Sequence, residues 1–147
     1  MNDDLANLTI FTAARQIEAG LLSPVALVEA HLARIEALDP QLDSFLTVTA
    51  DQAIEAARDA EKEIAAGRYL GPLHGIPFGL KDIYDTAGIP TTGHSRTAAD
   101  RIPEANATTT ARLLAAGGVL MGKLATHEFA HGGPSFDLPW PPARNPW

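Results

Sequence analysis

The residue best placed to do chemistry is a lysine that closes an apolar segment. Lys81 is preceded by Gly75 and Gly79, which let backbone or substrate approach closely. A lysine that loses its solvation there has a lowered pKa, and a neutral amine can accept a proton from a hydroxyl. The alternative is a solvated ammonium at a strand end, paired with Asp82 or Asp85. Spacing alone favours this second interpretation, because most lysines are solvated.

A second pattern has the form of a metal site. Residues 127–131 read H-E-F-A-H, which matches the H-E-x-x-H motif of zinc peptidases. On one helix its two histidines would share a face and bind zinc, while Glu128 would polarise the bound water. However, Gly132, Gly133 and Pro134 follow at once and argue against a long helix here. We therefore predict no metal, and the zinc peptidase ranks last among the alternatives.

The first third of the chain predicts helices. An apolar stripe at helical spacing indicates a first helix, with the members Ile10, Ala13, Ala14, Ile17 and Leu21. Gly20 is placed to end this helix in a left-handed turn. Ser23 and Pro24 are typical of a helix start, and Pro40 is expected to stop the helix that follows.

The next segment predicts a strand and a third helix. Residues 44–48 are β-branched and aromatic, which indicates a short strand. Thr49 and Gln52 fit a capping box at the start of an alanine-rich helix. This helix should run to about Ala66, with Gly67 as its cap residue.

From Tyr69 onward the chain becomes rich in glycine and proline. Residues 76–83 and 119–121 are apolar enough for buried strands, and residues 107–116 between them predict a helix. This order indicates a crossover unit in a parallel or mixed sheet. We therefore predict an α/β fold, in which a helical layer of residues 1–68 covers a mixed β-sheet begun by residues 69–147, the two forming one domain.

Composition excludes several classes of protein. The chain has 147 residues, of which 46% are hydrophobic and 20% charged, as in ordinary globular proteins. Eleven basic residues against 18 acidic ones give a net charge of −7 without a basic cluster, which argues against direct nucleic-acid binding. There is no cysteine for disulfides or thiolate catalysis. An acidic start and the lack of a long apolar run predict a cytoplasmic protein without membrane contact.

Several motifs in the second half resemble one enzyme family. GPLHGIPFGLKDIYDTAGIPTTGHS resembles the lysine segment of the amidase signature family, G-P-L-x-G-I-P-x-x-x-K-D-x-x-D-x-x-G-x-P-T-T. ATTTARLLAAGGVLMGKLATHEFAHGG is similar to the family's helix, strand and G-K-x-x-x-x-E-F-A segment, and ARNPW to its N-P-W. The resemblance is strong from Tyr69 to Trp147 and extends to the first half only in pattern. Several motifs in one order are more specific than any one of them.

The resemblance implies a Ser–Ser–Lys triad in which Lys81 is the base. In that family the lysine takes a proton from a serine that follows a cis peptide bond, and this serine activates a nucleophilic serine. Backbone N–H groups of a Gly/Ser-rich loop stabilise the oxyanion. No such stretch occurs here, and the expected nucleophile is none of Ser23, Ser44, Ser95 and Ser135. The chain alone is therefore predicted to be inactive. The implied partners are a small amide substrate and the remainder of the amidase chain, with a homodimer left open and no cofactor.

A further segment resembles the one that flanks the family's substrate channel. It contains Thr126, Glu128 and Phe129, and Phe129 could contact the acyl part of a substrate. The alternative is that Glu128 braces the loop and Phe129 is core. Three functions stay open: an amidase, an A-type subunit of a glutamyl-tRNA amidotransferase, and a non-catalytic remnant or binding domain.

Two groups of polar residues near Lys81 are expected to be structural. Thr91, Thr92 and Ser95 should stabilise a turn by hydrogen bonds to the backbone. His74 is interpreted as a loop hydrogen-bonding residue and not as a metal ligand.

Overall fold

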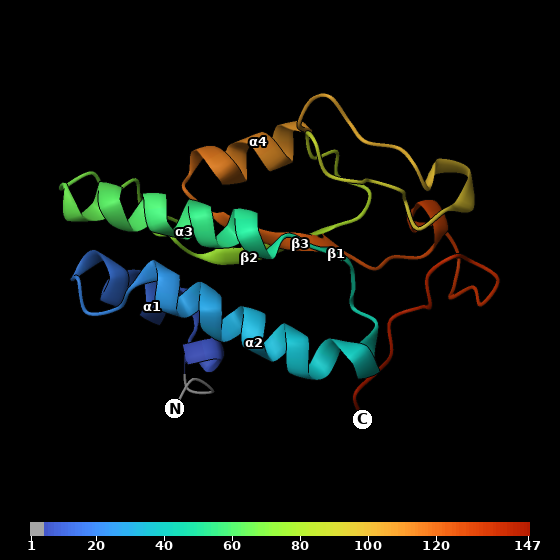
Figure 1. Ribbon diagram of the computed structural model, residues 1–147, viewed down its shortest axis with the longest axis horizontal. Coiled ribbons are helices and arrows are strands. Elements are labelled where there is room, and N and C mark those ends of the chain that lie inside the picture. Colours follow the sequence, from blue (N-terminus) through green and yellow to red (C-terminus); the bar gives the residue numbers. More distant parts are fainter. Residues whose placement is uncertain (1–4) are drawn as a thin grey trace. The chain divides into compact units, whose positions relative to one another are not determined.

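The computed structural model describes residues 5–147. Its elements follow one another along the chain (Figure 1) as α1 (Ile10–Glu18), α2 (Pro24–Leu42), β1 (Phe45–Val48), α3 (Ala50–Ala65), β2 (Pro77–Lys81), α4 (Thr108–Ala115) and β3 (Val119–Leu124). Short 3₁₀ helices occupy Leu5–Asn7, Arg96–Ala98 and Glu128–Ala130. Within this range no helix combines the length and the apolar character needed to span a membrane. The mixture of helices and strands confirms the predicted α/β class.

The residues group into two compact units. The first unit holds the described residues up to Ala37 together with Thr49–Phe78 and Arg112–Met121. The second unit holds Leu38–Val48, Gly79–Ala111 and Gly122–Trp147. Lys81 and the segment from Thr126 to Phe129 therefore belong to the second unit.

Apolar helix faces form the core of the first unit. Its central cluster consists of Ala13, Ala14, Ile17, Leu22, Leu27 and Ile76. The predicted stripe of α1 is confirmed in its middle, but Ile10 and Leu21 are 58% and 81% exposed. Leu21 lies beyond the end of α1, because Gly20 adopts a φ of +68° and turns the chain out of the helix. The prediction that Leu21 belongs to the buried stripe is therefore wrong.

Small residues let α2 and α3 approach each other, and Figure 1 shows the two helices side by side. Gly75 lies between them, where an added Cβ would be 2.9 Å from Pro24 and 3.8 Å from Ala60. The Ser23 hydroxyl at the start of α2 donates a hydrogen bond to Glu61 on α3. A glycine, an alanine and one polar contact thus fix the close approach.

One predicted helix boundary and one predicted side-chain cap are wrong. Helix α2 continues through Pro40 to Leu42, and Asp43 N–H still donates to the Asp39 carbonyl at 2.8 Å. A proline in the last turn removes only one helical hydrogen bond, so the helix tolerates it there. Thr49 makes no side-chain cap of α3, because its hydroxyl donates to the carbonyl of Leu120 at 3.1 Å. A partner distant in sequence thus replaces the predicted capping box.

The three strands form a mixed sheet in the order β1-β3-β2, which confirms the predicted sheet type. Strand β1 is antiparallel to β3, with Thr47 opposite Lys123 and Val48 opposite Gly122. Gly122 has a φ of +151°, and an added Cβ would lie 2.1 Å from the Thr47 carbonyl oxygen. Only glycine fits this point of the ladder. The sheet therefore presents the C-terminal residues of β3 beside the start of β1.

Candidate active site

Lys81 is the last residue of β2, and its side chain is exposed. Its neighbours Leu80 and Asp82 are 5% and 1% exposed, so Lys81 points to the opposite face, as successive strand residues do. Within residues 5–147 its ammonium has neither a hydrogen bond nor an ion pair. The predicted desolvation of Lys81 is therefore wrong for this part of the chain.

The alternative prediction for Lys81 is right about exposure and wrong about its partners. Asp82 forms an ion pair with Lys123, and Asp85 forms one with Arg101. Both carboxylates that adjoin Lys81 in sequence are thus occupied by other cations. The Lys81 amine stays available for a different group.

Lys81 lines a small cavity together with Thr126. The cavity has a volume of about 250 Å³ and is completed by Ala125, His127, Pro134, Pro142 and Ala143. Ligand pockets for drug-sized molecules range from about 300 to 1,000 Å³, so this space suits a small group. The structure thus brings together two of the predicted site residues.

Glu128 and Phe129 do not line the Lys81 cavity. Glu128 accepts a hydrogen bond of 2.6 Å from the hydroxyl of Ser95, which is fully buried. Phe129 is 58% exposed and lines a separate cavity of about 270 Å³ that includes Ile83. Its ring lies against Gly93, where an added Cβ would be 2.8 Å from the ring. Glu128 braces the loop, and the alternative that Phe129 is core is wrong.

The H-E-x-x-H segment does not form a helix that could hold zinc. Phe129 and Ala130 have φ values of +48° and +61°, so the chain makes a short left-handed turn between the two histidines. His127 and His131 therefore do not share a helical face. In residues 5–147 no three His, Asp or Glu side chains gather as a possible metal site.

A buried histidine fixes one wall of the Lys81 cavity. The backbone N–H of Thr126 donates to Nδ1 of His94 at 3.3 Å, and Nε2 of His94 lies 3.0 Å from the Trp140 carbonyl. One ring nitrogen accepts while the other faces an acceptor, so the contacts assign the ring proton to Nε2. The Trp140 ring meets this imidazole edge-on at 5.8 Å. His94 is not predicted from the sequence, because its partners lie 32 and 46 residues away.

Beside Lys81 lies a lysine that is fully buried. The Lys123 ammonium donates to Thr91 Oγ1 at 2.6 Å and to the Tyr84 carbonyl at 2.9 Å, and it lies 3.2 Å from Asp82 Oδ1. Burial lowers the pKa of Lys123, and the Asp82 carboxylate opposes this shift. Lys123 is not among the predicted site residues, although a lysine inside the apolar run VLMGKL is a signal of a buried charge.

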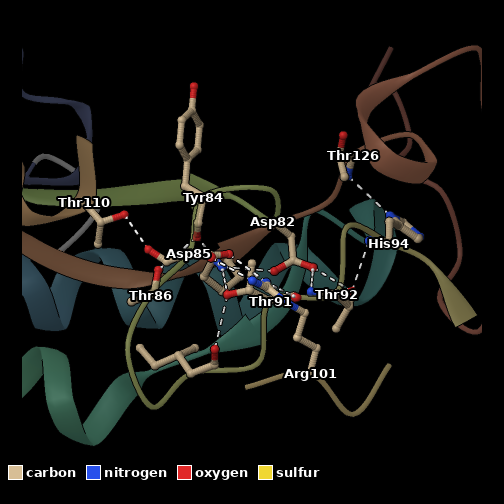
Figure 2. A network of polar contacts seen from close by, with 12 residues as sticks. Asp82, Tyr84, Asp85, Thr86, Thr91, Thr92, His94, Arg101, Thr110 and Thr126 are labelled. Carbon is tan, nitrogen blue, oxygen red and sulfur yellow. Dashed lines mark hydrogen bonds and ion pairs between the residues drawn. The ribbon is translucent and has the colours of Figure 1, made fainter. Parts of the chain in front are cut away.

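Polar contacts hold the loop that follows Lys81, as Figure 2 shows. Asp82 Oδ2 accepts from the N–H and the hydroxyl of Thr92 at 2.9 and 2.6 Å. Both terminal nitrogens of Arg101 donate hydrogen bonds of 2.7 Å to the Asp85 carboxylate, and this hydrogen bonding lowers the pKa of Asp85. Thr92 Oγ1 also accepts from the N–H of His94 at 3.0 Å, so its predicted role in a turn is confirmed.

Comparison with known proteins shows the family of the chain. The profile of the family described as Amidase matches residues 26–147. The chain belongs to the amidase family. The A-type subunit of the glutamyl-tRNA(Gln) amidotransferase of Chloroflexus aurantiacus is 45% identical over 144 residues, which are 98% of this amidase-family chain and 30% of that protein. The chain therefore spans about 30% of the length of the curated relatives that it matches.

Solved amidase structures share the fold. The peptide amidase of Stenotrophomonas maltophilia matches with a TM-score of 0.78 at 34% identity, over 84% of this chain and 26% of that one. Fatty acid amide hydrolase matches with a TM-score of 0.92 over 99% of this chain and 26% of that one. Its identity of 23% makes this second likeness one of fold alone. The amidase-family chain thus adopts the fold of the corresponding part of larger enzymes.

Proposed function

We propose that this chain supplies the lysine base of an enzyme that hydrolyses carbon–nitrogen amide bonds. The observation that carries the proposal is the placement of Lys81 in a member of the amidase family. Its amine ends β2, lines a cavity of about 250 Å³ with Thr126, and is unpaired within residues 5–147. An unpaired amine beside a small cavity is free to meet a second catalytic group and a small substrate.

The proposed chemistry is acyl transfer through a Ser–Ser–Lys triad. Lys81, as a free amine, takes the proton of a serine hydroxyl, and this serine in turn deprotonates the nucleophilic serine. The nucleophile attacks the amide carbonyl, the amine leaves with a proton, and water releases the acyl group. Both serines are supplied by sequence outside residues 5–147. The proposal requires that segment to cover Lys81, since the surrounding residues leave it exposed.

A second candidate is favoured by the relatives. Curated A-type subunits of glutamyl-tRNA(Gln) amidotransferase are 41–46% identical over nearly the whole chain. Such a protein would use the same lysine to hydrolyse an amide that supplies ammonia to a partner enzyme. The two candidates therefore differ in the amide accepted and in the fate of the ammonia, while Lys81 has the same task in both.

The test uses the full-length protein and replaces one lysine at a time. Lys81→Ala is expected to lower kcat for amide hydrolysis by about 100-fold or more, which is the range of general-base catalysis. Lys62→Ala is the matched control, because Lys62 is 75% exposed and pairs only with Asp59 on the surface of α3. Circular dichroism should show the same fold for both variants.

A panel of small amides that includes glutamine separates the candidates. Preference for glutamine, with ammonia passed to a tRNA-bound acceptor, supports the amidotransferase. Hydrolysis of simple amides supports the amidase. Near-normal turnover of Lys81→Ala would remove the base assignment, and a wild-type protein that hydrolyses no amide would favour the binding domain.

A further inference from the structure

We propose that Lys123 is a positioning residue for Lys81, which it orients by fixing the turn that follows β2. The inference rests on the proposed function, because it concerns the amine assigned there as the base. Lys123 is fully buried and cannot touch a substrate, so any effect on the reaction must pass through other residues.

The Lys123 ammonium makes two hydrogen bonds and one ion pair. It donates to Thr91 Oγ1 at 2.6 Å and to the Tyr84 carbonyl at 2.9 Å. Asp82 Oδ1 lies 3.2 Å away as its ion-pair partner. One cation therefore joins the turn after β2 to the loop around Thr91.

These contacts reach Lys81 through the backbone. The Lys81 carbonyl accepts from the N–H groups of Ile83 and Tyr84 at 2.8 and 3.1 Å. The Tyr84 carbonyl is in turn the acceptor for Lys123. Asp82 N–H donates at 2.9 Å to the carbonyl of Leu124, the residue after Lys123. The peptide group between Lys81 and Asp82 is thus held by Tyr84, whose carbonyl accepts from Lys123, and by Leu124, which follows Lys123 in the chain.

Asp82 sets the face from which Lys81 projects. Its Oδ1 has Lys123 as its partner, and its Oδ2 accepts from Thr92 twice, so the carboxylate is fixed in the interior. Figure 2 shows Asp82 pointing to Thr92. Neighbouring side chains of a strand project to opposite faces, and an Asp82 held inward places Lys81 outward. Without the ammonium, Asp82 Oδ1 would be a buried carboxylate oxygen with no partner, and the carboxylate would turn to water. That movement would carry Lys81 away from its cavity.

The experiment measures both turnover and the reactivity of Lys81 in the full-length protein. Lys123→Met keeps the side-chain length and removes the charge. Its kcat on an amide that the wild type hydrolyses should fall about 10- to 100-fold, as for a small misplacement of a catalytic group, while KM stays within about threefold. The reactivity of Lys81 is measured by acetylation with acetic anhydride over a pH series, followed by peptide mass spectrometry. In Lys123→Met, the pH dependence of Lys81 acetylation should differ from that of the wild type.

Control variants separate positioning from stability. Acetylation of Lys62, which lies in the first unit and is exposed, should be the same in the wild type and in Lys123→Met. Asp82→Asn combined with Lys123→Met leaves no unpaired charge, yet it should not restore kcat, because the bonds to Tyr84 and Thr91 stay lost. If Lys123→Met does not fold, Thr91→Val removes a single acceptor and should shift kcat and Lys81 acetylation in the same direction.

The outcomes are distinct. A folded Lys123→Met with wild-type kcat and an unchanged Lys81 acetylation profile would overturn the positioning role. A wild-type protein without amidase activity would overturn the proposed function instead. In that case the acetylation profile alone would still decide whether Lys123 orients Lys81.

Discussion

The two units are stabilised by different kinds of buried side chain. Of the buried hydrophobic residues in the described range, only Leu80 and Ile89 belong to the second unit. The interior of the second unit is instead polar, with the buried side chains Asp82, Thr86, Thr91, Thr92, His94, Ser95, Thr110 and Lys123. Apolar packing is nearly non-directional, whereas buried polar groups require specific partners at hydrogen-bonding distance. The unit that presents Lys81 is therefore the one with the more directional interactions.

The largest expected effect comes from breaking the charge pair of the second unit. Asp82→Ala leaves the Lys123 ammonium buried without its carboxylate, and loss of one partner of a buried pair costs about 3–5 kcal/mol. Chemical denaturation of the full-length protein measures the free energy of unfolding. Asp59→Ala is the control, because Asp59 is exposed in a surface pair with Lys62 and should change stability by at most about 1 kcal/mol. Equal losses in the free energy of unfolding would mean that the buried pair stabilises the protein no more than the surface pair does.

A core truncation in the first unit should have a slightly smaller effect. Leu27 is 2% exposed in the apolar cluster, and Leu27→Ala should cost about 3 kcal/mol through lost burial and a cavity. Leu27→Met keeps the volume and should cost less than about 1.5 kcal/mol. The same measurement on Lys123→Met sharpens the comparison, because that change also preserves side-chain length but removes a charge with two hydrogen bonds and one ion pair. If Lys123→Met were as mild as Leu27→Met, the second unit would be as tolerant as the first.

The difference between the units also explains how much of the fold the sequence predicts. Helices α1 and α3 and strands β1 and β3 follow from periodicity, since the residues that bury one face are close together in the chain. The error at the start of α3 has a non-local cause, because the Thr49 hydroxyl bonds to Leu120, which is 71 residues away. Pattern analysis of neighbouring residues contains no information on such partners.

The two lysines of the site show the same limit. Lys81 and Lys123 both lie at the end of an apolar run with a glycine one or two residues before them. The sequence predicted desolvation for Lys81, and the structure instead buries Lys123. What separates them is the supply of acceptors: the Tyr84 carbonyl and Thr91 Oγ1 are 39 and 32 residues from Lys123 in sequence. The resemblance to the family motif predicted Lys81 as the base, whereas residue spacing alone favoured a solvated cation.

The smallest effect concerns His74, a buried polar residue of the first unit. His74 is 1% exposed, and its Nδ1 accepts from the N–H of Leu70 at 3.2 Å. Burial lowers the pKa of His74 below its ordinary value of 6.5, although Glu63 opposes the shift. As the pH falls below 6.5, the unfolded chain binds a proton that the folded chain does not yet bind.

The free energy of unfolding should therefore be highest above pH 6.5 and should decrease from there to the lowered folded pKa. One proton limits the slope to about 1.4 kcal/mol per pH unit. Denaturant unfolding between pH 7.5 and pH 5 should show this decrease in the wild type. His74→Gln can still accept from Leu70 but cannot be protonated, so its stability should depend less on pH over the same interval. Parallel pH curves for the two proteins would mean that the imidazole binds protons equally in the folded and unfolded chains, so that Glu63 fully offsets the loss of solvation.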